Sequence, residues 1–367
     1  MTKHVPKSTK PSGIGHIRGR ARVTMHDIAR VAGCSQPTVS FVLNGNTGVK
    51  ISEATKRRVL LAANDLGYIL PDLAKSKSKP FDDNKYISGP IAFVVDSLST
   101  SPEAVHAFDG VTEAVKATGN IVLLAETGND PCLEPKVIRH FIEQKVSAIV
   151  YACIFTRKVA IPQILSQTDI PVFLLNCYSN NMEFPAVVPG EVSGGHTATN
   201  ALIELGHKRI ATITGEMFME AASDRLRGYR NALATADLPF CSELVIEGNW
   251  LPSSGYSATR VLMSLSKPPT AIFCQNDRMA IGCYEALKEM RLRIPEDISI
   301  IGYDDDEVAR HLSPPLTSMN LASRALGRWV IEQLFHGQNE INMRHPLTKL
   351  ECELVERDSI SAPNLSI

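Results

Sequence analysis

The sequence contains no apolar run close to the roughly 20 residues that a membrane-spanning helix requires. Its first 22 residues include no apolar segment of the kind that defines a secretory signal. The eight cysteines form neither a CxxC pair nor a spacing typical of metal sites, so scattered thiols in a reducing compartment explain them best. These absences predict a cytoplasmic protein that binds neither a metal nor a membrane.

Catalytic signatures are also missing. The sequence holds no G-x-S-x-G, Walker, HExxH or glycine-rich dinucleotide motif, and none of the ten histidines stands beside an obvious Ser or Cys nucleophile. We therefore predict that the protein is not an enzyme and needs no cofactor. A sugar-processing enzyme is one alternative, but it would need an acid–base pair that is not evident.

Acidic residues are scarce in one part of the chain. Residues 1–79 contain fourteen Lys and Arg but four Asp and Glu, a net charge of +10. The remainder contains 38 − 14 = 24 basic and 39 − 4 = 35 acidic residues, a net charge of −11. A basic head on an acidic body is typical of a nucleic-acid-binding module joined to a module with another role. A merely solvated basic face would not explain why the bias ends so abruptly.

Two short helices joined by a tight turn are predicted for residues 25–44, MHDIARVAGCSQPTVSFVLN. Gly33 tolerates the positive φ of a turn, Ser35 is a good N-cap, and Pro37 follows where no N–H is needed. Val39 lies on the inner face of the second helix, whose small polar residues form an outer face that could enter a major groove. On spacing alone, an ordinary helical hairpin is an equally good interpretation.

The run over residues 25–66 resembles the DNA-binding headpiece of the LacI/GalR family of bacterial transcription regulators. The phrases DIARVAG, TVSFVLNG, SEATKRRVL and LGY occur in order at nearly the family's spacing. The resemblance implies that the second helix reads operator bases through Gln36, Pro37 and Phe41, and that a third helix covers residues 52–65. The residues expected at the DNA are Thr24, Ser35, Gln36, Pro37, Thr38, Ser40, Phe41, Asn44, Lys75 and Lys77.

Three segments precede the main body of the chain. Residues 1–22 carry six basic and no acidic residues without apolar periodicity, which predicts a disordered tail. The headpiece occupies residues 23–70, and the polar residues 71–85 predict a hinge or linker. In the family this hinge inserts a leucine into the minor groove, whereas here Lys77 occupies that position and is expected to lie toward phosphate. Leu73, one turn earlier, is the alternative wedge.

Apolar runs alternate with helical stretches over residues 86–367. Eight runs are interpreted as buried strands: Pro90–Asp96, Ile121–Ala125, Ala148–Ala152, Pro171–Asn176, Arg209–Thr214, Leu244–Glu247, Ala271–Cys274 and Ile298–Tyr303. The alternation predicts an α/β core of two doubly wound parallel sheets with a cleft between them. Ligands bind beyond the carboxyl ends of such strands, so the loops that follow are the place to search.

The family resemblance continues through IELGHKRIATITG, RLRGY, EGNWLPSSGY, PTAIFCQND, IPEDISIIGYDDD and LSPPLTS. These stretches resemble the family's effector-binding core, which is similar to periplasmic sugar-binding proteins. The resemblance implies that the chain crosses three times between two subdomains. It places residues 86–188 and 320–337 in the N-terminal subdomain, and residues 189–319 and 338–360 in the C-terminal one.

Four residues lead the candidates for effector binding. By resemblance, Arg225 reaches effector oxygens with its guanidinium fork and Trp250 stacks on the apolar face of a pyranose. Asn276 offers a donor and an acceptor to adjacent hydroxyls, and Asp304 accepts from them. Further candidates at the ends of predicted strands are Asp96, Tyr151 and Asn176. A structural ion pair for Arg225 and a core position for Trp250 are the alternatives.

Two further features of the sequence concern the ligand. Asp304, Asp305 and Asp306 resemble a metal-binding cluster, but consecutive residues leaving a strand alternate in direction, so no metal is predicted. The family commonly opens the second subdomain with an Asp-Asn pair, and this chain has Pro189 and Gly190 there.

Together these features predict a transcriptional repressor whose affinity for double-stranded operator DNA is changed by a small-molecule effector, a sugar or sugar derivative. A homodimer is expected, because one short recognition helix makes few contacts and a symmetric dimer reads two half-sites. A periplasmic sugar-binding receptor is the remaining alternative, and the basic headpiece argues against it.

Overall fold

The computed structural model describes residues 25–43, 52–65, 89–98, 102–116, 118–336 and 347–364. The tail predicted for residues 1–22 and the hinge predicted for residues 71–85 lie outside this set. Contacts divide the chain into two units, Met1–Tyr86 and Ile87–Ile367.

The first unit contains the helices α1 (Met25–Ala32), α2 (Gln36–Leu43) and α3 (Glu53–Asp65). Gly33 adopts φ 62° in the turn, and the Ser35 hydroxyl accepts a hydrogen bond from the backbone N–H of Thr38 at 3.4 Å. These observations confirm the predicted helix pair and its cap. Small and branched apolar residues form the core between the helices: Ile28, Ala29, Ala32, Val39, Val59, Ala62 and Ala63.

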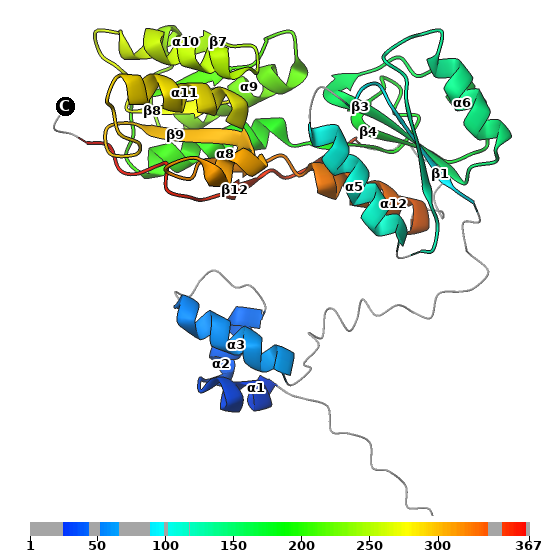
Figure 1. Ribbon diagram of the computed structural model, residues 1–367, viewed down its shortest axis with the longest axis horizontal. Helices are drawn as coiled ribbons and strands as arrows, with labels where there is room; N and C mark the ends of the chain where they lie inside the picture. The colour runs from blue at the N-terminus through cyan, green and yellow to red at the C-terminus, as the bar shows by residue number, and fades with distance from the viewer. Residues whose placement is uncertain are drawn as a thin grey trace, which may run out of the picture. The chain divides into compact units, whose positions relative to one another are not determined.

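The second unit consists of two α/β lobes, each built on a six-stranded sheet (Figure 1). The sheet of the first lobe has the order β11-β5-β4-β3-β1-β2 and that of the second lobe β12-β10-β9-β8-β6-β7. The strands of the first lobe are β1 (Ile91–Val95), β2 (Val122–Glu126), β3 (Ala148–Lys158), β4 (Val172–Tyr178), β5 (Ala186–Pro189) and β11 (Leu347–Leu350). Those of the second lobe are β6 (Ile210–Thr214), β7 (Val245–Glu247), β8 (Ala271–Cys274), β9 (Ser299–Asp304), β10 (Thr317–Asn320) and β12 (Glu353–Val355).

All eight predicted strands are present, and the predicted α/β class with two doubly wound sheets is confirmed. The pairings are parallel except that of β10 with the edge strand β12. The central strands are buried on both faces, which explains why they are continuous apolar runs: every residue of β1 and of β8 is buried.

Helices cover both faces of the first sheet. On one face α5 (Pro102–Lys116) lies beside α12 (Ser323–His336), and on the other lies α6 (Glu134–Glu143) (Figure 1). The short helix α7 (Gln163–Ser166) packs on the same face as α6. The pair α5 and α12 approaches closely because both helices carry glycine at the crossing. A Cβ on Gly110 would lie 2.0 Å from the carbonyl oxygen of Arg324.

The second sheet is covered in the same way. On one face α8 (Glu191–Glu204) packs with α9 (Glu220–Thr235), and on the other α10 (Pro252–Met263) packs with α11 (Asp277–Glu289). Two short 3₁₀ helices, η2 (Ser242–Leu244) and η3 (Glu307–His311), complete this lobe.

One subdomain boundary differs from the prediction. The resemblance places residues 338–360 in the C-terminal subdomain, but β11 pairs in parallel with β5 of the first sheet, with Leu347 opposite Ala186. The edge of β5 would otherwise be exposed, and a short added strand satisfies its backbone groups. The chain returns to the second sheet at β12.

Within the part of the chain that the structure describes, no helix is long and apolar enough to span a membrane.

Candidate functional site

A cavity of about 260 Å³ lies between the two lobes, lined by residues that follow the carboxyl ends of strands in both sheets. Five of the seven predicted effector residues line it: Asn176, Arg225, Trp250, Asn276 and Asp304. They come from both lobes and are far apart in the sequence. Such convergence of polar groups at strand ends is typical of ligand sites in parallel sheets.

Arg225 is a buried residue of α9 and is 3% exposed. Its Nε and Nη2 donate to the two carboxylate oxygens of Glu191 at 2.6 and 3.0 Å, and its Nη1 donates to the carbonyl oxygen of Gln275. The guanidinium carbon lies 3.7 Å from the centroid of the Tyr303 ring. Burial lowers the pKa of Arg225, but the charges of Glu191 and Asp304 outweigh it and raise that pKa above its ordinary value. The arginine is therefore held in one orientation and stays charged.

Asp304 ends β9 with a φ of 101°, which few residues other than glycine adopt. Its Oδ1 lies 3.5 Å from Nη1 of Arg225. Burial raises the pKa of Asp304 well above its ordinary value, although the charge of Arg225 opposes this shift. Backbone strain of this kind is found at ligand sites, where the surrounding structure maintains it.

Asn276 is the N-cap of α11: its Oδ1 accepts from the backbone N–H of Met279 at 2.8 Å. Its Nδ2 donates to the carbonyl oxygen of Trp250 at 3.1 Å. Trp250 has a φ of 65°, and its Nε1 donates to the sulfur of Met219 at 3.0 Å. One amide thus fixes both the start of a helix and the backbone that carries the indole ring.

Asn176 lines the pocket from the first lobe. Its Nδ2 donates to the carbonyl oxygens of Cys153 and Ile154 at 3.0 and 3.1 Å, and its Oδ1 accepts from the hydroxyl of Thr156. Its φ is 56°. The side chain therefore shapes the end of β3 as well as facing the cavity.

The structure does not bring Asp96 and Tyr151 to this pocket. The reason is that β3 continues to Lys158, beyond the strand end predicted at residue 152. Tyr151 therefore lies within the strand, on the face covered by α6, where its hydroxyl donates to Glu134 at 2.7 Å. The carboxylate of Asp96 accepts from the backbone N–H of Ile154 at 2.9 Å and pairs with Arg157 at 3.0 Å.

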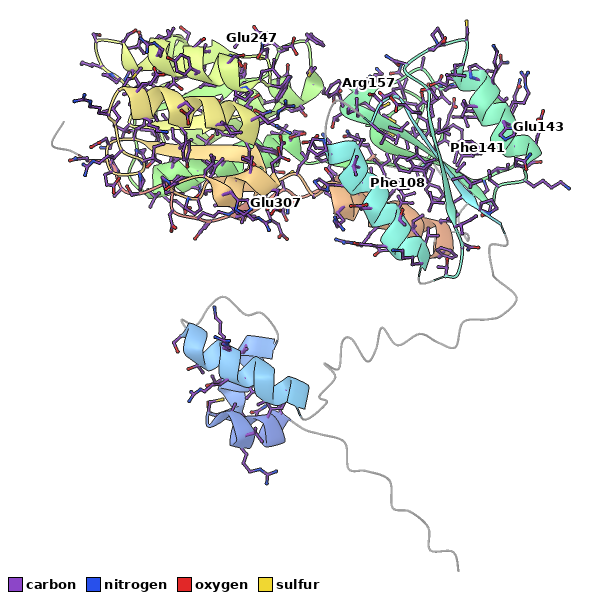
Figure 2. The ribbon with its side chains drawn as sticks, viewed as in Figure 1. Phe108, Phe141, Glu143, Arg157, Glu247 and Glu307 are labelled. Carbon is purple, nitrogen blue, oxygen red and sulfur yellow. The ribbon has the colours of Figure 1, made fainter. Side chains whose placement is uncertain are left out.

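Figure 2 labels Arg157 at the edge of the first lobe that faces the second lobe. The extended end of β3 thus occupies the place where Asp96 was expected to meet a ligand.

Three acidic residues of the pocket were not predicted from the sequence: Glu103, Glu191 and Glu216. Glu191 begins α8 directly after Pro189 and Gly190, the pair that departs from the family pattern, and its bidentate contact with Arg225 is buried. Glu103 lies in the first turn of α5, the helix that follows β1. Burial raises the pKa of Glu103 to about 7. The departure at residues 189–190 was the available signal for Glu191.

The side chains of Asp304 and Asp305 have different partners, as predicted for consecutive residues leaving a strand. Asp304 faces Arg225, Asp305 accepts from Arg357, and the backbone N–H of Asp306 donates to Asp277. Among the described residues no group of three or more His, Cys, Asp or Glu side chains is arranged to hold a metal ion.

In the headpiece, Ser35 and Gln36 are exposed at the start of α2, and Thr38 is half-buried. The side chains of Pro37, Ser40 and Phe41 are not described, and Thr24, Asn44, Lys75 and Lys77 lie outside the described residues.

Comparison with protein families gives two matches. Residues 24–70 match the bacterial regulatory proteins of the lacI family, and residues 199–360 match the periplasmic binding protein-like domain. The first match covers all three headpiece helices, and the second covers most of the second lobe together with α12 and β11.

Relatives that align over most of the chain are also transcription regulators. The chain is 30% identical to the HTH-type transcriptional repressor PurR of Vibrio atlanticus, over 93% of this chain and 99% of that protein. It is 30% identical to the ribose operon repressor of Haemophilus influenzae, over 92% and 98%. A solved structure of the transcriptional regulator CelR with cellobiose aligns with a TM-score of 0.62 and 29% identity, over 92% of this chain and 100% of that one. These relatives are regulators, which confirms the prediction that the chain is not an enzyme.

Proposed function

Because the chain belongs to the LacI family of bacterial regulatory proteins, we propose that it is a cytoplasmic repressor whose affinity for operator DNA is switched by a sugar bound between the lobes of its core. The observation that carries the proposal is the convergence of Asn176, Arg225, Trp250, Asn276 and Asp304 on one cavity. The ribose operon repressor and the CelR complex with cellobiose support a sugar as the effector.

The chemistry of the lining suits a sugar ring. Trp250 offers an aromatic face for the apolar side of a pyranose, and the amide of Asn276 offers donors and an acceptor to neighbouring hydroxyls. Arg225 and Asp304 add charged groups that strengthen hydrogen bonds to hydroxyls. Because the lining comes from both lobes, a bound ring would favour the closed arrangement of the two lobes over an open one.

DNA binding is assigned to the headpiece, with the exposed start of α2 facing the major groove. Two headpieces are needed for two half-sites, so the active species is a homodimer. The residues predicted at the DNA include Lys75 and Lys77 in the segment 71–85, which would link each headpiece to its core. Ligand-dependent closure would change the distance between the two linkers.

The test combines a thermal-shift screen of sugars on the full-length protein with mobility-shift assays on DNA from upstream of the gene. We expect one sugar to raise the unfolding temperature and, at the same concentration, to change operator affinity by about 5- to 150-fold, the usual range of allosteric coupling. A sugar that binds the core but leaves operator affinity unchanged would contradict the switch.

A further inference from the structure

The pocket contains more acidic than basic side chains. Four carboxyl groups and two guanidinium groups line it: Glu103, Glu191, Glu216, Asp304, Arg225 and Arg278. Counted as ionised, these groups give a charge of 2 − 4 = −2. Asp277, between Asn276 and Arg278 in the sequence, is buried and accepts from the Ser318 hydroxyl at 2.6 Å and from the Asp306 N–H at 2.8 Å.

Arg225 does not offset this excess for a ligand, because its charge is matched by protein carboxylates. Glu191 accepts two of its N–H groups, and Asp304 lies 3.5 Å from a third nitrogen. The same nitrogen donates to the Gln275 carbonyl. An anionic ligand approaching Arg225 would therefore meet two carboxylates around one guanidinium, and like charges at this distance repel.

Glu103 and Asp304 line the cavity from opposite lobes. Glu103 belongs to the first lobe and Asp304 to the second, and the charge of Glu103 raises the pKa of Asp304. Besides burial, the charge of Asp306 raises the pKa of Glu103, while Arg225 and Arg278 lower it. A positive group placed between Glu103 and Asp304 would stabilise the ionised form of both carboxyl groups, which burial and the neighbouring negative charges disfavour.

We propose that the effector carries a protonated nitrogen in addition to its hydroxyl groups, and that this nitrogen lies between Glu103 of the first lobe and Asp304 of the second. An ammonium donates up to three hydrogen bonds and would pair with a carboxylate on each side of the cleft. The Trp250 ring lines the same cavity and offers a face that attracts cations. The inference rests on the proposed function and specifies its ligand as an amino sugar or a similar polyhydroxylated amine.

The test is isothermal titration of the full-length protein with matched sets of hexoses. For the gluco, galacto and manno series, the neutral hexose, the 2-amino-2-deoxyhexose and the hexose 6-phosphate are compared at pH 7. We expect an amino sugar to bind about tenfold or more tightly than its neutral counterpart, as a charge-assisted hydrogen bond implies. We also expect the amine to release protons from the carboxyl groups, seen as a binding enthalpy that depends on the buffer.

Glu103→Gln should remove most of this preference, measured as the ratio of the affinity of the amino sugar to that of its neutral counterpart. Glu285→Gln is the matched control, since it makes the same change at an exposed position of α11 outside the pocket lining. Thermal unfolding of both variants checks that they fold. Retention of the amine preference in Glu103→Gln overturns the placement of the nitrogen.

A neutral hexose or a hexose phosphate that binds more tightly than the amino sugar overturns the inference, and so does a panel in which no amino sugar binds. If such a neutral or phosphorylated ligand still changes operator affinity, the proposed function stands and the ligand class alone is wrong. If an amino sugar binds as expected but operator affinity does not respond, the ligand class stands and the proposed switch fails.

Discussion

The two lobes present their pocket residues in different ways. In the second lobe Arg225 is 3% exposed and Asn276 4% exposed, and each is fixed by hydrogen bonds to side chains or backbone of the same lobe. In the first lobe Phe155 is 39% exposed, and Glu103 is half-buried at the start of a helix. Preordered groups lose less conformational entropy when a ligand binds. Asn176 of the first lobe is also held by hydrogen bonds, so the contrast concerns the charged side chains. We infer from it that the second lobe is the binding template and that the first lobe closes on it.

The largest effect on stability and effector binding is expected from removing the positive charge of Arg225 in the second lobe. Arg225→Ala leaves the carboxylates of Glu191 and Asp304 buried without their partner, which should lower the free energy of unfolding by about 3–5 kcal/mol and abolish effector binding. Urea unfolding and titration with the effector measure both. The double variant Arg225→Met and Glu191→Met should recover much of the stability without recovering binding, because two apolar side chains replace a buried ion pair. A loss below about 1 kcal/mol in the single variant would show that the pair is not a structural anchor.

A smaller effect is expected from the titrating group of the first lobe. Folding raises the pKa of Glu103 from 4.5 to about 7, so the folded state binds this proton more tightly than the unfolded state. The free energy of unfolding should therefore fall as the pH rises through the window between 4.5 and about 7. Glu103→Gln should be more stable than the wild type by roughly 1–2 kcal/mol at pH 8 and closer to it at pH 5. Urea unfolding at both pH values tests this, and a constant difference would mean that Glu103 is not the responding group.

Variants of Asn276 can distinguish the contribution of this residue to the stability of the second lobe from its contribution to effector binding. Asn276→Ala removes the N-cap of α11 and should lower the free energy of unfolding by about 1 kcal/mol as well as weakening effector binding. Serine is also a good N-cap, so Asn276→Ser should keep the stability but lose the amide that holds the Trp250 carbonyl. Thermal unfolding and titration are compared for the two variants. If serine restored binding together with stability, Asn276 would act through the helix cap alone.

Much of the fold follows from the sequence because buried parallel strands are continuous apolar runs. The four strands that were not predicted, β5, β10, β11 and β12, have three or four residues each, and two of them lie at sheet edges. Short segments of this kind are strands because a neighbouring edge has free backbone groups, and this depends on tertiary structure rather than on local pattern.

The sequence predicts those pocket residues whose strands it locates correctly, and it misplaces or misses the others. Arg225 and Asn276 follow β6 and β8, and Asp304 is the last residue of β9; the sequence locates the ends of these three strands within one residue. Tyr151 and Asp96 were misplaced by one error, because the predicted strand ended at Ala152 whereas β3 continues to Lys158. Glu191 was missed because a carboxylate at the start of a helix is ordinarily explained by the helix dipole, and its contact with Arg225 spans 34 positions in the sequence.

The smallest predicted effect concerns a hydrogen bond that joins the lobes. Tyr178 ends β4 in the first lobe, and its hydroxyl donates to Glu220, at the start of α9 in the second, at 2.7 Å. Burial, with a contribution from Glu220, raises the pKa of Tyr178 to about 12, so the hydroxyl remains a donor at neutral pH. Because the bond exists when the lobes are close together, it stabilises the closed arrangement without contacting the ligand.

Tyr178→Phe should therefore weaken closure by about 0.5–1.5 kcal/mol and lower effector affinity by roughly two- to tenfold. Tyr256→Phe is the matched control: its hydroxyl makes the same kind of bond, to Glu289 at 2.6 Å, but both residues belong to the second lobe. The control should leave effector affinity unchanged, because its bond is equally present in open and closed arrangements and so does not favour either. Titration of both variants, with X-ray scattering to follow closure, makes the comparison. Equal losses of affinity in the two variants would mean that the hydrogen bond between the lobes has no special effect on closure. The proposed roles, with the second lobe as the template and the first lobe as the part that closes, would then be wrong.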